Sequence, residues 1–258
     1  MPNKITLSPP DRTDEPIGIG IGDRSDTWFS GKPAPVNHPV QDRTNVSNPE
    51  PQALDTPVPA RLAVLFSGGG RTLENLAEQC RDGRINGQVV LGIGSRSTCG
   101  GLERCERLGI ESCVIRARDF DGNVERFGQA VFDRIRAAGV TLVCLAGYLT
   151  LLPIPHDYLG RVLNIHPALL PKFGGKGMYG DRVHQAVLDS GDSESGCTVH
   201  FADNEYDHGQ IVHARRVPVL AGDTAETLAA RVFAAECEAY PEAVNKVLGG
   251  CVTLAADD

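Results

Sequence analysis

Short apolar runs alternate with amphipathic segments over residues 61–248, and this alternation restricts the fold more than any other feature of the chain. Residues 61–66 form an apolar run that is typical of a strand buried on both faces of a sheet. Residues 72–80 follow with apolar side chains at helical spacing. Because parallel strands need a crossover segment between them, usually a helix, the repeated alternation predicts an α/β fold with a Rossmann-like, doubly wound, mostly parallel sheet.

The same pattern continues until the last third of the chain. Further strands are expected at 89–94, 113–115, 140–146 and 160–166, and further helices at 101–108, 124–138 and 182–189. Strands at 197–202 and 211–219 are joined only by residues 203–210, which leaves no room for a crossover helix, so this pair should be antiparallel. A helix at 224–247 should be kinked or split by Pro241.

Composition divides the chain into unequal parts. Residues 1–58 hold ten of the 17 prolines and no apolar run of strand or helix length, so burial cannot offset the entropy of ordering them. We therefore expect a disordered, Pro-rich N-terminal extension at 1–58, a catalytic domain at 59–250 and a short C-terminal tail at 251–258.

Charge and cysteine usage exclude several classes of protein. A net charge of −8 argues against a nucleic-acid surface, and no apolar stretch reaches membrane-spanning length. The N-terminus lacks a basic region followed by an apolar one, and it is too acidic for an organelle transit peptide. The eight cysteines form no Cys-x-x-Cys and no cluster with metal-ligand spacing, which favours reduced thiols and no bound metal. These features favour a cytoplasmic protein. The sequence leaves monomer and homodimer both open, and the small-molecule partners are those that the family resemblance described below implies.

One expected strand ends in two chemically active side chains. Asn164 and His166 are two residues apart and should share a face, while Pro167 stops the strand and leaves them at the end of the sheet. An amide beside a titratable imidazole suits a reaction that builds negative charge on a carbonyl oxygen. A carboxylate from the 203–210 link could orient the imidazole, and spacing leaves three candidates open, namely Asp203, Glu205 and Asp207.

Two loops follow strands whose carboxyl ends should meet at the same edge of the sheet, where ligands bind in open α/β folds. Residues 67–72 are glycine-rich but lack both the Walker Gly-Lys-Ser/Thr and the third glycine of the dinucleotide fingerprint. This loop is therefore either a tight turn or a site for a phosphate that is not part of a dinucleotide, with Arg71 as an extra cation. Residues 146–153 could line a flat heterocycle or simply cap the core.

Taken together, these segments resemble the glycinamide ribonucleotide formyltransferases of purine synthesis, almost end to end over residues 61–248. The matching pieces stand in family order and are Ser67-Gly-Gly-Gly70, Gly101-Leu-Glu-Arg104, Leu145-Ala-Gly-Tyr148, Leu163–Pro171, Gly196–Phe201 and Tyr206-Asp207. The resemblance implies the formyltransferase fold. It also implies transfer of a formyl group from 10-formyltetrahydrofolate to the primary amine of 5-phosphoribosylglycinamide.

The resemblance also assigns roles to residues. Asn164, His166 and Asp207 fall on the catalytic positions. Asn164 and protonated His166 would donate to the developing oxyanion, while Asp207 would favour the charged form of His166 and hold its ring. A water would relay the proton of the attacking amine. The ligand-binding positions are Gly70, Arg71 and Thr72 for the substrate phosphate, held through backbone amides, and Leu149, Thr150, Leu151, Leu152 and Asn164 for the folate.

The chain departs from the family pattern at three places. The family usually has Met-Arg where Leu149-Thr150 stand here, and its upstream folate arginine falls near Asn123. The lysine and glutamate that many members use near the C-terminus match Thr253 and Ala256. The cations that we expect to replace the lost charge are Lys172, Lys176 or Arg182.

Four alternatives are weighed against this interpretation. Methionyl-tRNA formyltransferase shares the catalytic trio but adds a C-terminal barrel domain, which we do not expect here. Formyltetrahydrofolate hydrolase carries an N-terminal regulatory domain and a second histidine where Pro167 stands. A sugar-amine formyltransferase is disfavoured by the phosphate-type first loop. A non-catalytic folate- or nucleotide-binding relative is disfavoured because Asn164, His166 and Asp207 are all present.

Overall fold

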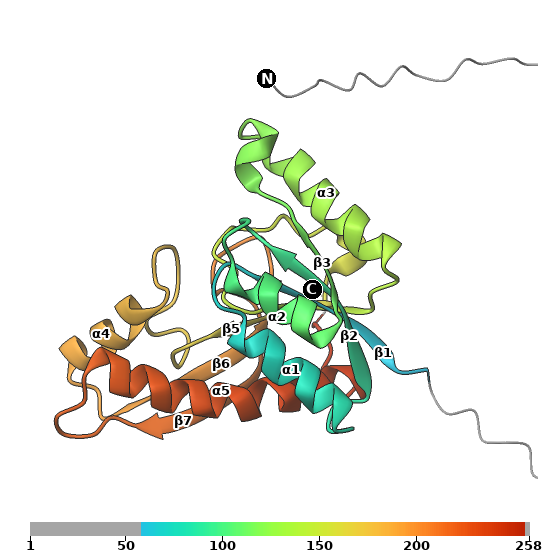
Figure 1. Ribbon diagram of the computed structural model, residues 1–258. Helices are drawn as coiled ribbons and strands as arrows, with labels where there is room; N and C mark the ends of the chain where they lie inside the picture. Colours follow the sequence, from blue (N-terminus) through green and yellow to red (C-terminus); the bar gives the residue numbers. More distant parts are fainter. Residues whose placement is uncertain (1–57, 256–258) are drawn as a thin grey trace, which may run out of the picture. The chain divides into compact units, whose positions relative to one another are not determined.

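The computed structural model describes residues 58–255, and in this part of the chain seven strands form one sheet in the order β3-β2-β1-β4-β5-β6-β7 (Figure 1). The strands are β1 (Ala60–Phe66), β2 (Gly87–Gly94), β3 (Glu111–Val114), β4 (Leu142–Leu145), β5 (Val162–His166), β6 (Glu194–Phe201) and β7 (Ile211–Pro218). Strands β1 to β5 pair in parallel, and β6 and β7 pair antiparallel. The expected fold class and the antiparallel pair are confirmed.

Helices cover both faces of this sheet (Figure 1). The α-helices are α1 (Arg71–Arg81), α2 (Gly100–Leu108), α3 (Val124–Ala137), α4 (Asp181–Ser190) and α5 (Ala225–Leu248), and two short 3₁₀ turns are Ala117–Phe120 and His156–Tyr158. Alternate residues of β1 face opposite sides, so Leu62 and Val64 pack toward α1 and α5, while Ala63 and Leu65 pack toward α3. Strand β1 is therefore buried on both faces, as its apolar run predicts.

Two groups of residues lie outside the described part of the chain, 1–57 and 256–258. The expected disordered extension falls almost entirely on the first group, and the expected match at Ala256 falls on the second. Among residues 58–255, no helix is both long and apolar enough to cross a membrane. All eight cysteines are described, and each is a free thiol.

The prediction that Pro241 kinks or splits the last helix was wrong about the split, because α5 runs unbroken from Ala225 to Leu248. Proline has no N–H, so the Cys237 carbonyl one turn earlier loses its helical partner. The side-chain amide of Asn75 on α1 donates to that carbonyl at 3.0 Å. The helix therefore tolerates Pro241 because a neighbouring helix satisfies the group that proline leaves unpaired.

This pairing predicts a coupling between two substitutions. Asn75→Ala should lower the free energy of unfolding by about 1 kcal/mol, because the Cys237 carbonyl then has no donor. In a Pro241→Ala background the new Ala N–H can bond that carbonyl, so the same Asn75→Ala change should cost almost nothing. A double-mutant cycle measured by urea denaturation checks this. Equal costs in both backgrounds would contradict it.

Candidate active site

A cavity of about 660 Å³ lies at the carboxyl edge of β1, β4 and β5. Its walls come from the turn after β1, the loop after β4, the end of β5, the loop before α4, the β6–β7 link and the first half of α5. Every residue to which the family resemblance assigned a catalytic or ligand-binding role lies on this wall: Gly70, Arg71, Thr72, Leu149, Thr150, Leu151, Leu152, Asn164, His166 and Asp207. Residues up to 137 positions apart in the chain (Gly70 to Asp207) are thus gathered at one cavity.

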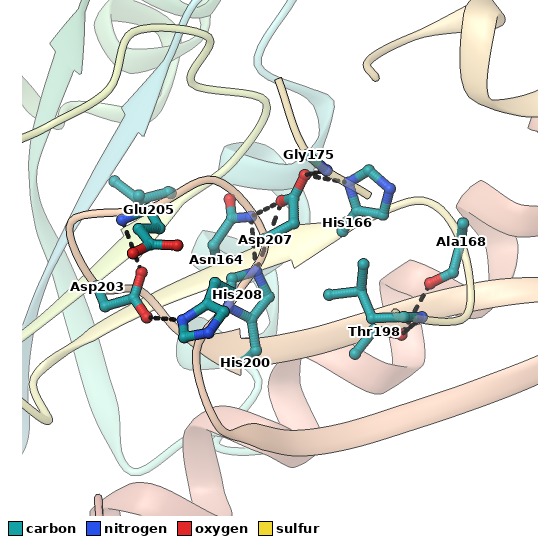
Figure 2. Close-up of polar contacts among 12 residues, drawn as sticks. Asn164, His166, Ala168, Gly175, Thr198, His200, Asp203, Glu205, Asp207 and His208 are labelled. Atoms are coloured by element: carbon teal, nitrogen blue, oxygen red, sulfur yellow. Dashed lines mark hydrogen bonds and ion pairs between the residues drawn. The ribbon is translucent and has the colours of Figure 1, made fainter. Parts of the chain in front are cut away.

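His166 is buried at the end of β5, and both nitrogens of its ring face hydrogen-bond acceptors (Figure 2). Its Nδ1 lies 3.3 Å from Oδ2 of Asp207, and its Nε2 lies 2.8 Å from the carbonyl oxygen of Phe173. A neutral imidazole has only one N–H, whereas the imidazolium donates from both nitrogens. The two acceptors therefore hold the ring of His166 in one orientation at the cavity wall.

Asp207 is the acid that orients His166, which resolves the choice among the three candidates. Asp203 instead contacts Nδ1 of His208 at 2.9 Å (Figure 2). Among the described residues, no hydrogen bond or ion pair joins Glu205 to His166. Asp207 also accepts from the Gly175 N–H at 2.9 Å. Burial opposes ionisation of Asp207, but its contacts with His166 and His200, the charge of His166 and the Gly175 N–H outweigh it. Together they hold the pKa of the carboxyl well below its usual range.

The amide of Asn164 is part of the same cluster. Its Nδ2 lies 3.2 Å from Oδ1 of Asp207 and 3.0 Å from Nε2 of His200. Since Nδ1 of His200 faces the Phe201 carbonyl at 2.8 Å and must carry the proton, Nε2 is free to accept from Asn164. Both N–H groups of the amide therefore have partners, and donation from Asn164 to an oxyanion requires one of them to be given up.

His200 is a member of the cluster that the sequence did not single out. It is 1% exposed and lines the cavity. The register of β5 and β6 pairs Asn164 directly with His200, which brings their side chains together. Thr198, two residues earlier, accepts from the Leu170 N–H and donates to the Ala168 carbonyl, which fixes the turn after His166 (Figure 2). His200 can be assigned to the site only from the strand register, which sequence spacing does not give.

The glycine-rich turn after β1 has its shape fixed by sterics and by two arginines. Gly70 has φ 76°, and a Cβ there would lie 2.5 Å from the Cα of Gly101, so any side chain at position 70 would clash with the backbone. Arg104 donates to the Gly69 carbonyl and Arg96 to the Ser67 carbonyl, each at 2.7 Å. The turn leads into the first amides of α1, a geometry that suits an anion.

The loop after β4 combines apolar side chains with unused backbone donors. Leu152 is buried in the core, whereas Leu149 is 45% exposed beside the cavity. The Leu149 N–H bonds Oγ of Ser67 at 3.0 Å. Within the described residues, the N–H groups of Thr150, Leu151 and Leu152 make no hydrogen bond, so they remain open to a ligand at the cavity wall.

The structure also places the positions where the chain departs from the family pattern. Asn123 caps α3 by accepting from the Arg126 N–H, and it does not line the cavity. Thr253 lies outside the cavity too, and its carbonyl accepts from Gln210. Ala256, the expected match of the family's C-terminal glutamate, lies outside the described residues. Glu236 of α5, which the sequence did not single out, lines it instead.

Glu236 is an acid whose pKa is strongly perturbed. Burial raises the pKa of this carboxyl to about 7, although the positive charges of Arg71 and His166 oppose the shift. Glu236 lines the same cavity as Arg71 and His166. Perturbed acids of this kind are common at functional sites. Within the described residues, no group of three or more His, Cys, Asp or Glu side chains could hold a metal ion.

Three comparisons identify the relatives of this chain. Residues 60–244 match the family model described as "Formyl transferase". The chain is 44% identical over 189 residues to a chloroplastic phosphoribosylglycinamide formyltransferase of Arabidopsis thaliana, which covers 72% of this chain and 65% of that protein. It is 38% identical over 200 residues to the trifunctional purine biosynthetic protein adenosine-3 of Bos taurus, covering 77% of this chain and 19% of that one.

A solved structure agrees with these sequence relatives. The glycinamide ribonucleotide transformylase 1 of Symbiobacterium toebii superposes with a TM-score of 0.72 at 35% identity, covering 81% of this chain and 100% of that one. Fold, cavity and relatives together define a group-transfer enzyme of the α/β class. The chain belongs to the formyl transferase family.

The raised pKa of Glu236 predicts a pH-dependent stability. The folded state keeps a proton that the unfolded state releases above about pH 4.5, so the free energy of unfolding should fall as pH rises from 4.5 through 7. Glu236→Gln mimics the protonated acid, so it should match the parent protein near pH 4.5 and exceed its stability in alkaline solution. Urea denaturation at both pH values measures this, with Glu106→Gln on the exposed face of α2 as the control. A stability difference that does not change with pH would refute the prediction.

Proposed function

We propose that this protein transfers the formyl group of 10-formyltetrahydrofolate to the amine of 5-phosphoribosylglycinamide in purine biosynthesis. The observation that carries the proposal is the hydrogen-bonded cluster of Asn164, His166 and Asp207 on a cavity shared with the glycine-rich turn. Relatives whose names state this activity support it. The chain spans 65% of the length of the Arabidopsis protein and 19% of the length of the bovine one. The activity of those longer proteins is therefore a proposal for this chain.

The cavity has the features that a folate needs. A pterin is flat, apolar on its faces and rich in hydrogen-bonding groups at its edge. Apolar side chains of the loop after β4 can contact the faces, and the open N–H groups of Thr150, Leu151 and Leu152 can serve acceptors on the edge. Mixed apolar walls with a few polar groups are usual for cofactor sites of this size.

The position of His166 at the cavity wall suits it to stabilise an oxyanion. The formyl donor, when bound, supplies the electrophilic carbon that the substrate amine attacks. Nδ1–H of His166 is only loosely bonded to Asp207 at 3.3 Å, so it can be shared with an oxygen that gains negative charge. Asn164 lies on the same side and can contribute one N–H after releasing a partner. Asp207 contacts both side chains, and its lowered pKa keeps its carboxylate negatively charged.

Replacing the orienting carboxylate should lower the rate sharply. Asp207→Asn removes the carboxylate that orients His166 and Asn164, and we expect kcat to fall about 10²–10³-fold, the usual cost of losing an oxyanion donor. Steady-state formyl transfer measures this. Asp192→Asn, whose acid pairs with Lys172 away from the cavity, is the matched control and should keep its rate. An Asp207→Asn variant with unchanged kcat would exclude this role.

The function itself is tested by mixing the purified protein with 10-formyltetrahydrofolate and following tetrahydrofolate formation with and without phosphoribosylglycinamide. We expect turnover that depends on the acceptor. Turnover without the acceptor would favour a hydrolase instead. No turnover in either mixture would favour a non-catalytic relative.

We further propose that residues 59–250 are the catalytic domain, preceded by an extension and followed by a short tail, and that the protein is cytoplasmic. The Arabidopsis relative is described as chloroplastic, so the location is worth testing directly. Fractionation of cells with an antibody against the native protein tests it, and recovery in an organelle fraction would contradict it.

A further inference from the structure

Arg71 and Phe233 form a stacked pair on the cavity wall. The guanidinium carbon of Arg71 lies 4.0 Å from the centre of the Phe233 ring. Arg71 is the first residue of α1, and Phe233 lies in the first half of α5, so two helices far apart in sequence build the pair. Both side chains line the cavity beside Gly70. Stacking holds the guanidinium plane in one orientation without using its N–H groups.

The guanidinium of Arg71 is also chemically free. Within residues 58–255 it forms neither a hydrogen bond nor an ion pair with any side chain. Other arginines of this region are already engaged: Arg104 and Arg107 pair with Glu74, and Arg96 donates to the Ser67 carbonyl. A cation that faces a cavity, is held in place by an aromatic ring and has no carboxylate partner is available to bind an anion.

The cations expected from the sequence fit this role less well. Lys172 pairs with Asp192 at 2.8 Å and does not line the cavity. Arg182 lies 5.2 Å over the Tyr179 ring and is also absent from the wall. Lys176 does line the cavity, but from the loop before α4 rather than from the glycine-rich turn.

We propose that Arg71 is the side chain that binds the phosphate of the acceptor substrate, and that Phe233 is the positioning residue that aims it. The inference rests on the proposed function and deepens it. Arg71 stands next to the amides at the start of α1, so one phosphate can accept from the backbone and from a guanidinium at once. A guanidinium can bond two oxygens of a phosphate in parallel, which gives orientation as well as affinity.

Substitutions of Arg71 and of Phe233 should raise KM for the acceptor by different factors. Arg71→Met keeps an apolar stem against Phe233 but removes the charge, so KM for phosphoribosylglycinamide should rise about 10- to 100-fold with kcat and the KM for the folate nearly unchanged. Phe233→Leu keeps the charge but removes the ring, so the same KM should rise about 3- to 10-fold. The acceptor without its phosphate, ribosylglycinamide, should be used equally by the parent protein and Arg71→Met.

Controls separate this inference from the proposed function. Lys172→Met should behave as the parent protein does. A KM rise in Lys176→Met but not in Arg71→Met would overturn the assignment while leaving the function intact. So would an Arg71→Met variant whose preference for the phosphorylated acceptor over ribosylglycinamide equals that of the parent protein. If the parent protein shows no turnover, calorimetry with inorganic phosphate still decides: binding that Arg71→Met weakens supports the anion site, and equal binding by both proteins refutes it.

Discussion

The ionised carboxylate of Asp207 is the interaction on which the candidate active site depends. It accepts from Asn164 and the Gly175 N–H and faces Nδ1 of His166, so one side chain connects β5, the loop before α4 and the β6–β7 link. Asp207 adopts a positive φ of 55°, an unfavourable backbone conformation that its surroundings impose. The contacts that lower its pKa outweigh its burial, and the same contacts place His166 and Asn164 side by side.

Sheet topology explains why these groups can meet. The first connection takes β1 to β2 at one side, and the later strands return to β4 at the other side of β1, so the strand order reverses at β1. Ligands of open α/β sheets bind at such a switch point, at the carboxyl ends of the strands. Antiparallel β6 then pairs with β5 and brings His200 opposite Asn164, while the link after β6 carries Asp207 back to the same edge. Parallel strands supply the turn and the loop, and the antiparallel strand with its link supplies His200 and Asp207 of the candidate site.

Much of this arrangement could be predicted from the sequence, because it depends on local pattern. The apolar runs give the strands, the short 203–210 link gives the antiparallel pair, and Pro167 places His166 at a sheet end. The choice among Asp203, Glu205 and Asp207 needed either a family resemblance or coordinates, because all three lie within one short loop. His200, Glu236 and Phe233 were not found because strand register and the rotation of a helix decide which way they face. The sequence also could not show that the last helix stays unbroken at Pro241, because this depends on Asn75, which lies on another helix.

Helix α5 shows how the core and the cavity constrain each other. The hydroxyl of Tyr240 is buried and lies 3.0 Å from the carbonyl oxygens of both Leu145 and Leu163, so it ties the helix to β4 and β5 close to where those strands reach the site. Phe233 lies seven residues earlier, about two helical turns or roughly 10 Å along the axis, and Glu236 lies between them on the same face. Fixing the rotation of α5 at Tyr240 therefore also fixes the direction in which Phe233 and Glu236 point. The packing of Tyr240 in the core thus sets the position of Phe233, which contacts Arg71, and of Glu236 on the cavity wall.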